Sequence, residues 1–356
     1  MSGYESLTLR AGPAALARIR RDGLERGAIR AVAGAAGGPK WLILPHLDRF
    51  LFGEWLGDQP VDLVGASIGT WRFTAACDGR DPAAAITRLE EAYIEQRYST
   101  GAGREEITSV TRSILDRVLP PESAAGVAAH PSRRLTAVTV RARGPGGSER
   151  RGIQALGSGL AGGANLVSRR ALGLAYERVL FQHPEVAALR LAGEWIPTRR
   201  VALTADNVRD AVYASGSIPL HMAGARDPAG APPGVYRDGG IVDYHIDQPL
   251  VDDGLVLMPH FADRLIPGWF DKFLPWRQRP RHATNTVLVG PSRRFLARLP
   301  QGRIPDRKDF LRYDGRDAER IRDWRACAAE GERLADEFRR WLADPDPARH
   351  LAPLLT

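Results

Sequence analysis

The feature that most constrains the fold is a repeated order of strand-like runs, glycine-rich turns and helical patterns near the start of the chain. Residues 29–33 form an apolar run that leads into the glycine-rich stretch "GAAGG", and residues 39–56 then have the length and apolar spacing of a helix. Residues 61–67 repeat the strand pattern, and residues 68–79 repeat the helical pattern. This order predicts an α/β fold in which helices cover a parallel sheet.

The remaining segments predict further strands and helices. Residues 81–130 space their apolar positions as a helix does, and so does the charged C-terminal part at about 306–342. The glycine-rich residues 144–166 are expected to form a flexible connection or a hairpin, and residues 234–250 are rich in turns. Strand patterns occur in residues 134–143, 197–219 (which also contain a helical pattern), 253–261 and 284–291.

Length and composition fit one globular domain. The chain has 356 residues, of which 44% are apolar, and it shows no internal repeat or long linker. We expect a single domain over residues 1–356, with a motif-bearing core at about 27–300 and a helical decoration at 301–356. Cys77 and Cys327 match no metal or redox spacing, so neither a disulfide framework nor a metal site is expected.

The charge balance gives little reason to expect a nucleic-acid partner. The net charge is +8, but the basic residues are spread along the chain rather than clustered. No run of about 18 apolar residues occurs, as a membrane-spanning helix requires, and the N-terminal residues lack the pattern of a signal peptide. We therefore expect a cytoplasmic protein.

One serine lies where an apolar strand pattern meets a helical pattern. The sequence Gly65-Ala66-Ser67-Ile68-Gly69 matches G-x-S-x-G, in which a sharp turn holds a nucleophilic serine above the sheet and both glycines allow close backbone approach. The helix that follows directs its first N–H groups toward negative charge at this serine. A tight turn of small residues would have the same sequence, so the motif alone leaves both interpretations open.

The glycine-rich loop offers donors that a serine hydrolase needs. Gly37 and Gly38 precede a helix and can present their N–H groups to the oxyanion of a tetrahedral intermediate, whereas Pro39 has no N–H. The competing interpretation is a nucleotide-binding P-loop. Lys40 fits that pattern, but Pro39 replaces a required glycine and Trp41 replaces the hydroxyl that binds Mg²⁺. A non-catalytic nucleotide- or lipid-binding module stays open as an alternative from another class.

A nucleophilic serine needs a base, and an aspartate in a turn is the first candidate. Asp238 stands before Gly239 and Gly240, where a sharp turn can expose its carboxylate at the end of the sheet, although Asp-Gly is also a common turn dipeptide. None of the eight histidines lies in a motif that distinguishes it. An α/β-hydrolase with a Ser-Asp-His triad, and His260 or His282 as the base, therefore stays open as an alternative.

Four short blocks, in this order, resemble the motifs of patatin-like phospholipases. They are the glycine-rich loop that ends at the basic Lys40, the G-x-S-x-G turn, the segment "ASGSIPL" at 214–220 and the D-G-G turn, and together they extend over about residues 27–260. Ala36 and Trp41 depart from the glycines that are usual in the loop of that family. The resemblance implies a three-layer α/β/α sandwich with a mostly parallel central sheet and extra C-terminal helices.

The resemblance also implies a function and the residues that carry it. Ser67 would attack a carboxylic ester of a lipid, Asp238 would act as its base, and no cofactor or metal would take part. Acyl transfer to an acceptor other than water would use the same residues. Gly37 and Gly38 would form the oxyanion hole, and supporting positions would be Lys40, Gly65, Gly69, Gly239 and Gly240.

Residues 263–281 bear on the substrate. They interleave Trp269, Phe270, Phe273 and Trp276 with lysine and arginine, a composition suited to peripheral contact with a membrane surface. An aromatic loop that packs on the sheet would have the same composition, so both interpretations stay open.

Overall fold

A mixed sheet runs through the centre of the molecule. The computed structural model describes residues 4–186, 189–192 and 195–355, and within them eleven strands form this sheet. In spatial order the strands are β11 (Ala352–Pro353), β1 (Leu7–Ala11), β10 (Thr286–Pro291), β9 (Leu255–Pro259), β2 (Ile29–Gly34), β3 (Val61–Ala66), β4 (Arg133–Ala142), β5 (Tyr176–Gln182) and β6 (Thr198–Ala202). Off this path, β8 (Val235–Asp238) pairs with β4, and β7 (Ala225–Arg226) pairs with β8. The strands from β10 to β4 are all parallel, and antiparallel neighbours lie at both ends.

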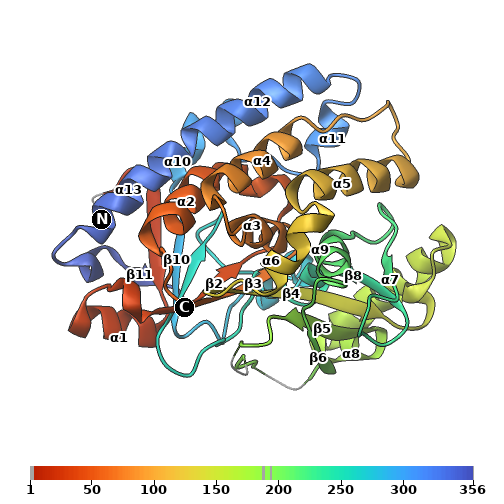
Figure 1. The fold of residues 1–356 in the computed structure, drawn as a ribbon, viewed down its shortest axis with the longest axis horizontal. Coiled ribbons are helices and arrows are strands. Elements are labelled where there is room, and N and C mark those ends of the chain that lie inside the picture. The colour runs from red at the N-terminus through yellow and green to blue at the C-terminus, as the bar shows by residue number, and fades with distance from the viewer. Residues whose placement is uncertain (1–3, 187–188, 193–194, 356) are drawn as a thin grey trace.

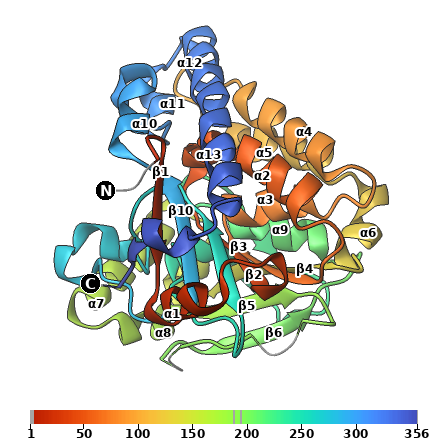
Figure 2. The ribbon, with the colours of Figure 1, turned by 90° about the vertical axis from the view of Figure 1, so that its left-hand side faces the viewer.

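Helices cover one face of the sheet. Alternate strand residues such as Val32 and Leu63 belong to the large apolar core on this side. Figure 1 shows the helices above the sheet, and Figure 2 shows the same layer after a quarter turn. These helices are α2 (Pro45–Phe50), α3 (Ile68–Ala76), α4 (Pro82–Ile94), α5 (Arg104–Val118), α6 (Ala124–Ala128) and α9 (Val208–Gly216).

The opposite face is covered by irregular chain and by two helices. Ala33 and Val64 belong to a second apolar cluster on this side, together with Tyr244 from the segment after β8. Helices α7 (Arg151–Val167) and α8 (Leu172–Ala175) pack near β4 and β5 in a third cluster. The predicted α/β fold, with a mostly parallel central sheet between two covering layers, is confirmed.

The C-terminal helices lie outside the helical layer. α12 (Asp317–Glu330) packs on a 3-10 helix at Gly38–Ile43 and on α4, and α13 (Glu332–Leu342) packs on α2. The helical pattern predicted at about 306–342 is therefore confirmed. No helix within the described part of the chain is both long enough and apolar enough to cross a membrane. The remaining α-helices are α1 (Pro13–Asp22), α10 (Arg293–Arg298) and α11 (Asp309–Arg312).

The single helix predicted over residues 39–56 is wrong, because the segment is broken into three pieces. It consists of the 3-10 helix, then α2, then a π-helical turn at Leu51–Trp55. Pro45 has no N–H to continue a helical ladder. Instead, Leu44 N–H donates to Trp41 O at 2.7 Å and closes a tighter turn before α2 begins.

The flexible connection or hairpin predicted at residues 144–166 is also wrong. The segment begins with a 3-10 turn at Gly144–Gly147, and from Arg151 onward it forms helix α7. Gly157 allows close packing, because a Cβ at this position would lie 2.4 Å from Gly146 N in the preceding turn. The small residues thus let the helix lie directly on the turn.

Gly157→Ala is expected to lower, and Gly159→Ala to raise, the free energy of unfolding. A methyl group at Gly157 would meet the backbone of Gly146, whereas a Cβ at Gly159 would meet nothing within 4 Å apart from its chain neighbours and the backbone of its own helix. Overpacking costs about 1–3 kcal/mol, and alanine in an exposed helix is about 0.5–1 kcal/mol better than glycine. Chemical denaturation measures both variants. Equal stabilisation by the two substitutions would contradict this packing.

Candidate active site

Two strands end at neighbouring positions along the same edge of β4. β3 runs parallel to β4 and ends with Ala66 opposite Val138. β8, in a segment predicted only to be rich in turns, runs antiparallel to β4 and ends with Asp238 opposite Thr139. The two strand ends therefore face each other, and the residue that follows β3 is Ser67.

The side chains of Ser67 and Asp238 form a buried hydrogen bond. Ser67 Oγ donates to Asp238 Oδ2 over 2.7 Å, and the two residues are only 7% and 9% exposed. The other carboxylate oxygen, Oδ1, accepts the N–H of Gly240 at 2.7 Å. The structure thus brings together the two residues that the sequence predicted as nucleophile and base.

The backbone at Ser67 has the strained geometry of a sharp turn. Its φ of 54° and ψ of −127° lie outside the regions that residues with a side chain favour. The N–H of Ser67 donates to Ser215 Oγ in α9 at 2.9 Å, and this hydroxyl lies 2.7 Å from both Thr70 Oγ1 and Val138 O. These contacts tie the turn between β3 and α3 to the neighbouring helix and strand.

The predicted glycines bring the motif segments into direct contact. A Cβ at Gly69 would lie 2.4 Å from Gly34 O, so the serine turn packs on the end of β2. A Cβ at Gly240 would lie 2.6 Å from Ala36 Cβ, so the D-G-G turn packs on the glycine-rich loop. Contacts under 3.0 Å exclude side chains at two further predicted positions, Gly65 and Gly239.

Gly37 lies in the loop that follows β2, and Gly38 is the first residue of the 3-10 helix. Among the residues that the structure describes, neither N–H donates to another group. The loop is fixed, because Ala36 N–H donates to Tyr244 O at 2.8 Å and the ring of Phe261 packs on Gly37. These two unused donors are therefore available to form an oxyanion hole.

Burial sets the basicity of the Asp238 carboxylate. Loss of solvent raises the pKa of this group above its ordinary value, although hydrogen bonds from Ser67 and Gly240 and the charges of Arg307 and Lys272 act to lower it. A carboxylate with a raised pKa accepts a proton more readily than one in water. In direct contact with Ser67 Oγ, Asp238 is therefore well suited to act as a general base.

The contacts of the two candidate histidines do not suit a base for Ser67. His260 is fully buried, its Nδ1 accepts the N–H of Ala262 at 2.9 Å, and burial lowers the pKa of its ring to about 3. His282 is exposed. In the described chain, neither ring hydrogen-bonds to Ser67 or Asp238. The geometry thus favours a dyad over a triad.

Lys40 and Trp41 occupy different surroundings at the end of the loop. Lys40 Nζ lies 5.3 Å from the centroid of the Phe261 ring, beside Gly37. Trp41 is fully buried in the core, with its ring edge-on to that of Tyr93. A P-loop would need a metal-binding hydroxyl where Trp41 is buried, so the geometry gives the nucleotide-binding alternative no support.

Three residues beside the pair were not predicted as site residues, and they are Ser215, Lys272 and Arg307. Ser215 lies in "ASGSIPL", so the resemblance of that segment was the available signal. Lys272 was considered only within the lipid-facing composition of residues 263–281. Arg307 lies in the C-terminal part, and no local pattern connects it with Gly38, against which its side chain packs.

No family model matches the chain, and no curated protein is significantly similar to it. The resemblance to patatin-like phospholipases therefore stays a prediction from four short motifs. Independently of that resemblance, the structure places the residues of these motifs in contact with one another.

Asp238→Asn is expected to raise the free energy of unfolding at pH 7. Because burial raises the pKa of Asp238, the unfolded chain ionises this group more readily, and stability falls as the pH rises from 3.8 through the folded-state pKa. Asparagine carries no charge and keeps an acceptor for Gly240. Denaturant unfolding measures the gain, which should shrink as the pH is lowered toward 3.8.

Asp243→Asn is the matched control with the opposite sign. Asp243 is also buried, which acts to raise its pKa, but Arg178 at 2.6 and 2.9 Å and Gln248 lower it overall. Its charged form therefore stabilises the folded protein above the ordinary pKa of 3.8, and the substitution should cost about 3–5 kcal/mol at neutral pH. If Asp238→Asn also lowered the free energy of unfolding, the ionised Asp238 carboxylate would stabilise the folded protein, and the prediction that its burial costs stability would be wrong.

Proposed function

We propose that this protein is a serine acyl hydrolase of the patatin-like type, which cleaves carboxylic ester bonds of lipids. The observation that carries the proposal is the buried hydrogen bond of 2.7 Å between Ser67 Oγ and Asp238 Oδ2 at a strained strand-to-helix turn. A serine hydroxyl is a weak nucleophile until a base takes its proton, and this base is already in contact with it. Backbone strain at a residue with a side chain is also concentrated at functional turns.

In the acylation step, Ser67 Oγ bonds to the carbonyl carbon of the ester while its proton passes to Asp238. The carbonyl oxygen becomes an oxyanion, which the N–H groups of Gly37 and Gly38 stabilise. Collapse of this tetrahedral intermediate breaks the bond to the leaving alcohol, and Asp238 returns the proton to that alcohol. The product of this step is an acyl ester on Ser67.

In the deacylation step, Asp238 takes a proton from a water molecule, whose oxygen attacks the acyl carbon. The bond to Ser67 Oγ then breaks, Ser67 recovers its proton from Asp238, and a carboxylic acid is released. An alcohol in place of water would give acyl transfer by the same steps. Both steps use only side chains and backbone groups of this chain.

A fluorophosphonate probe is expected to modify Ser67 in the folded protein, and short-chain esters are expected to be hydrolysed. Ser67→Ala should abolish both, and Asp238→Asn should lower kcat about 10²–10⁴-fold because it removes the general base. Mass spectrometry locates the modification, and ester hydrolysis gives kcat.

The controls are two exposed residues outside the pair, Ser113 and His282. Ser113→Ala tests whether the probe is selective, and His282→Ala tests whether this histidine is the base of a triad, so both variants should retain labelling and turnover. If Ser67 stays unmodified in folded protein and short-chain esters stay intact, the hydrolase proposal is wrong.

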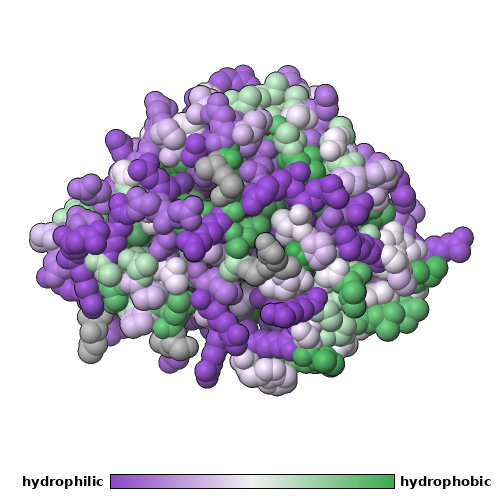
Figure 3. Space-filling view, turned by 90° about the horizontal axis from the view of Figure 1, so that it is seen from below, coloured by the Kyte–Doolittle hydropathy of each residue, from purple (hydrophilic) through white to green (hydrophobic). Residues whose placement is uncertain are grey.

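An exposed apolar surface supports the proposed contact with lipid. It is formed by one side of α7 and by the 3-10 turns that pack against it, and we call it the α7 surface. Figure 3 shows apolar side chains gathered at the right-hand end of the molecule, where α7 lies in Figure 1. Its large exposed side chains are Ile153, Leu156, Leu160, Phe273 and Trp276.

Some aromatic residues of the stretch 263–281 pack beneath the sheet, and others are exposed where a lipid could contact them. Trp269 and Phe270 are half-buried and pack on the apolar clusters beneath the sheet. Phe273 and Trp276 are 69% and 65% exposed on the α7 surface. Only part of this stretch is therefore available to a lipid.

Positive charge borders the α7 surface. Exposed arginines lie at the start of α7 and in the chain that flanks its other end, and the helix itself contains no acidic residue. An apolar face bordered by cations fits the surface of an anionic membrane. We propose a cytoplasmic protein that binds such a surface peripherally. The arginines are Arg150, Arg151, Arg170, Arg279 and Arg281.

Leu156→Glu and Leu160→Glu are each expected to weaken binding to vesicles of anionic phospholipid by about tenfold or more. Each change removes a leucine whose burial in the lipid would contribute about 1.5–3 kcal/mol, and it adds a charge of the same sign as the lipid. Cosedimentation with vesicles measures the affinity. Leu311→Glu, at an exposed leucine in α11, is the control and should bind as the wild type does. Unchanged binding by the α7 variants would contradict the lipid contact.

A further inference from the structure

Three cations approach Ser67 and Asp238 from distant parts of the chain. Lys40 follows the glycine-rich loop, Lys272 lies in a 3-10 turn (Phe270–Phe273) between β9 and β10, and Arg307 precedes α11. Lys272 and Arg307 both act on the charge of Asp238. Lys40 and Arg307 in turn act on Lys272. The three positive charges thus form one cluster beside the pair.

Short contacts place Lys272 and Arg307 against residues that adjoin the pair. Lys272 Nζ lies 3.8 Å from the centroid of the Tyr244 ring, and this ring lies 3.6 Å from the position of a Cβ at Gly240, in the D-G-G turn. Arg307 Cγ lies 3.2 Å from the position of a Cβ at Gly38, in the oxyanion loop. The cluster therefore borders both motifs of the site.

The three cations have no carboxylate partner in contact. Among the described residues, no ion pair within 4.0 Å includes Lys40, Lys272 or Arg307. Asp306 acts on the cluster from a greater distance and pairs with Arg312 at 3.6 Å. Burial and the charges of Lys40 and Arg307 lower the pKa of Lys272 to about 7. Half-buried like charges without partners oppose folding, and an anion bound among them would offset that cost.

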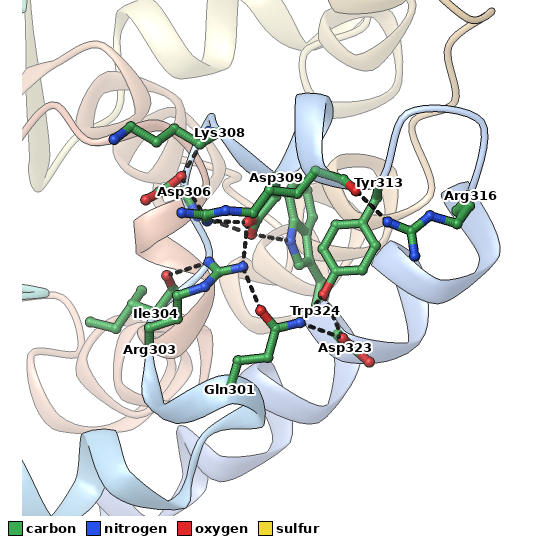
Figure 4. A network of polar contacts seen from close by, with 11 residues as sticks. Gln301, Arg303, Ile304, Asp306, Lys308, Asp309, Tyr313, Arg316, Asp323 and Trp324 are labelled. Atoms are coloured by element: carbon green, nitrogen blue, oxygen red, sulfur yellow. Dashed lines mark hydrogen bonds and ion pairs between the residues drawn. The ribbon is translucent and has the colours of Figure 1, made fainter.

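The C-terminal segment fixes the position of Arg307. Asp309 pairs with Arg303 at 2.7 Å and accepts hydrogen bonds from Trp324 Nε1 at 3.0 Å and from Asp306 N–H at 3.2 Å. Figure 4 shows Asp309 at the centre of these contacts, which join the chain on both sides of Arg307 to α12. The side chain that reaches the oxyanion loop is thus carried by a well-anchored segment.

We propose that Lys40, Lys272 and Arg307 form a subsite for an anionic group of the substrate, a phosphate or a carboxylate, beside the ester that Ser67 attacks. The inference rests on the proposed function and adds a substrate class to it, namely acyl esters with a negative charge close to the scissile bond. The guanidinium of Arg307 can bind two oxygens of such a group at once, and the lysines add charge.

A bound anion also changes the reactivity of the base. The charges of Arg307 and Lys272 act to lower the pKa of Asp238. A phosphate or carboxylate beside them neutralises this effect, so Asp238 becomes a stronger base when the anionic substrate is in place. The subsite thereby couples substrate recognition to activation of Ser67, and it gives the C-terminal helices a function.

The test compares esters that share one acyl chain but carry a phosphate, a carboxylate or a neutral hydroxyl near the ester bond. The wild type should hydrolyse an anionic ester with a kcat/KM at least about tenfold above that of the neutral ester. Arg307→Gln and Lys272→Met should each lower this ratio at least about tenfold, because each removes one cation of the subsite. The phosphate and carboxylate esters, compared with each other, identify the anion.

Lys308→Gln is the matched control, since Lys308 is exposed and adjoins Arg307 in the sequence. This variant should keep the ratio of the wild type. The subsite would be overturned if the wild type hydrolysed anionic and neutral esters with equal kcat/KM. It would also be overturned if Arg307→Gln and Lys272→Met kept the ratio of the wild type. In both cases, labelling of Ser67 and hydrolysis of the neutral ester would leave the proposed function intact.

Calorimetry with inorganic phosphate tests the subsite apart from catalysis. The wild type and Lys308→Gln should bind phosphate at least about tenfold more tightly than Arg307→Gln does. This readout separates the two proposals, because it supports the subsite even in a protein that hydrolyses no ester. Equal phosphate affinity in all variants would contradict the subsite, and circular dichroism checks that each variant is folded.

Discussion

The register along β4 is the constraint on which the candidate site depends. β3 and β8 reach the same edge of β4 from opposite directions, and they stop opposite the consecutive residues Val138 and Thr139. Ser67 and Asp238, 171 positions apart in the sequence, thereby come within one hydrogen bond of each other. A shift of either strand by one residue would turn its side chains to the other face and separate the pair. Sheet pairing, rather than a contact between mobile loops, sets the distance between nucleophile and base.

The buried carboxylate of Asp238 has no ion pair within the described chain, unlike most other buried acids. Most other buried acids have a cation in contact, as Asp48 does with Arg72 at 2.7 Å and Asp243 does with Arg178 at 2.6 Å. Asp247 is an exception, because its carboxylate accepts three backbone N–H groups. The Asp238 carboxylate instead contacts a serine hydroxyl and a backbone N–H, while unpaired cations lie nearby. Such an arrangement lowers stability, and a packed core offsets the cost. The unpaired charge of Asp238 and the strained backbone of Ser67 both oppose folding, so a catalytic role explains them better than a structural role does.

The sequence predicted those parts of the structure that short segments determine. The order of strand and helix patterns was sufficient for the parallel sheet, and the turns around Ser67 and Asp238 were recognisable because each motif occupies only a few residues. Glycine misled at α7, since at Gly157 it permits close packing rather than a loop. Arg307 could not be predicted, because its place beside Gly38 depends on tertiary contacts of the C-terminal segment that leave no local pattern.

A crystal structure of the protein after reaction with a fluorophosphonate is the most direct test of this geometry. The phosphorus should be bonded to Ser67 Oγ, and one of its oxygens should lie about 2.7–3.1 Å from the N–H groups of Gly37 and Gly38. The carboxylate of Asp238 should stay beside Ser67, on the side from which water would attack. An adduct on another residue, or a phosphoryl oxygen that points away from the glycine-rich loop, would contradict the proposed catalytic pair and its oxyanion hole.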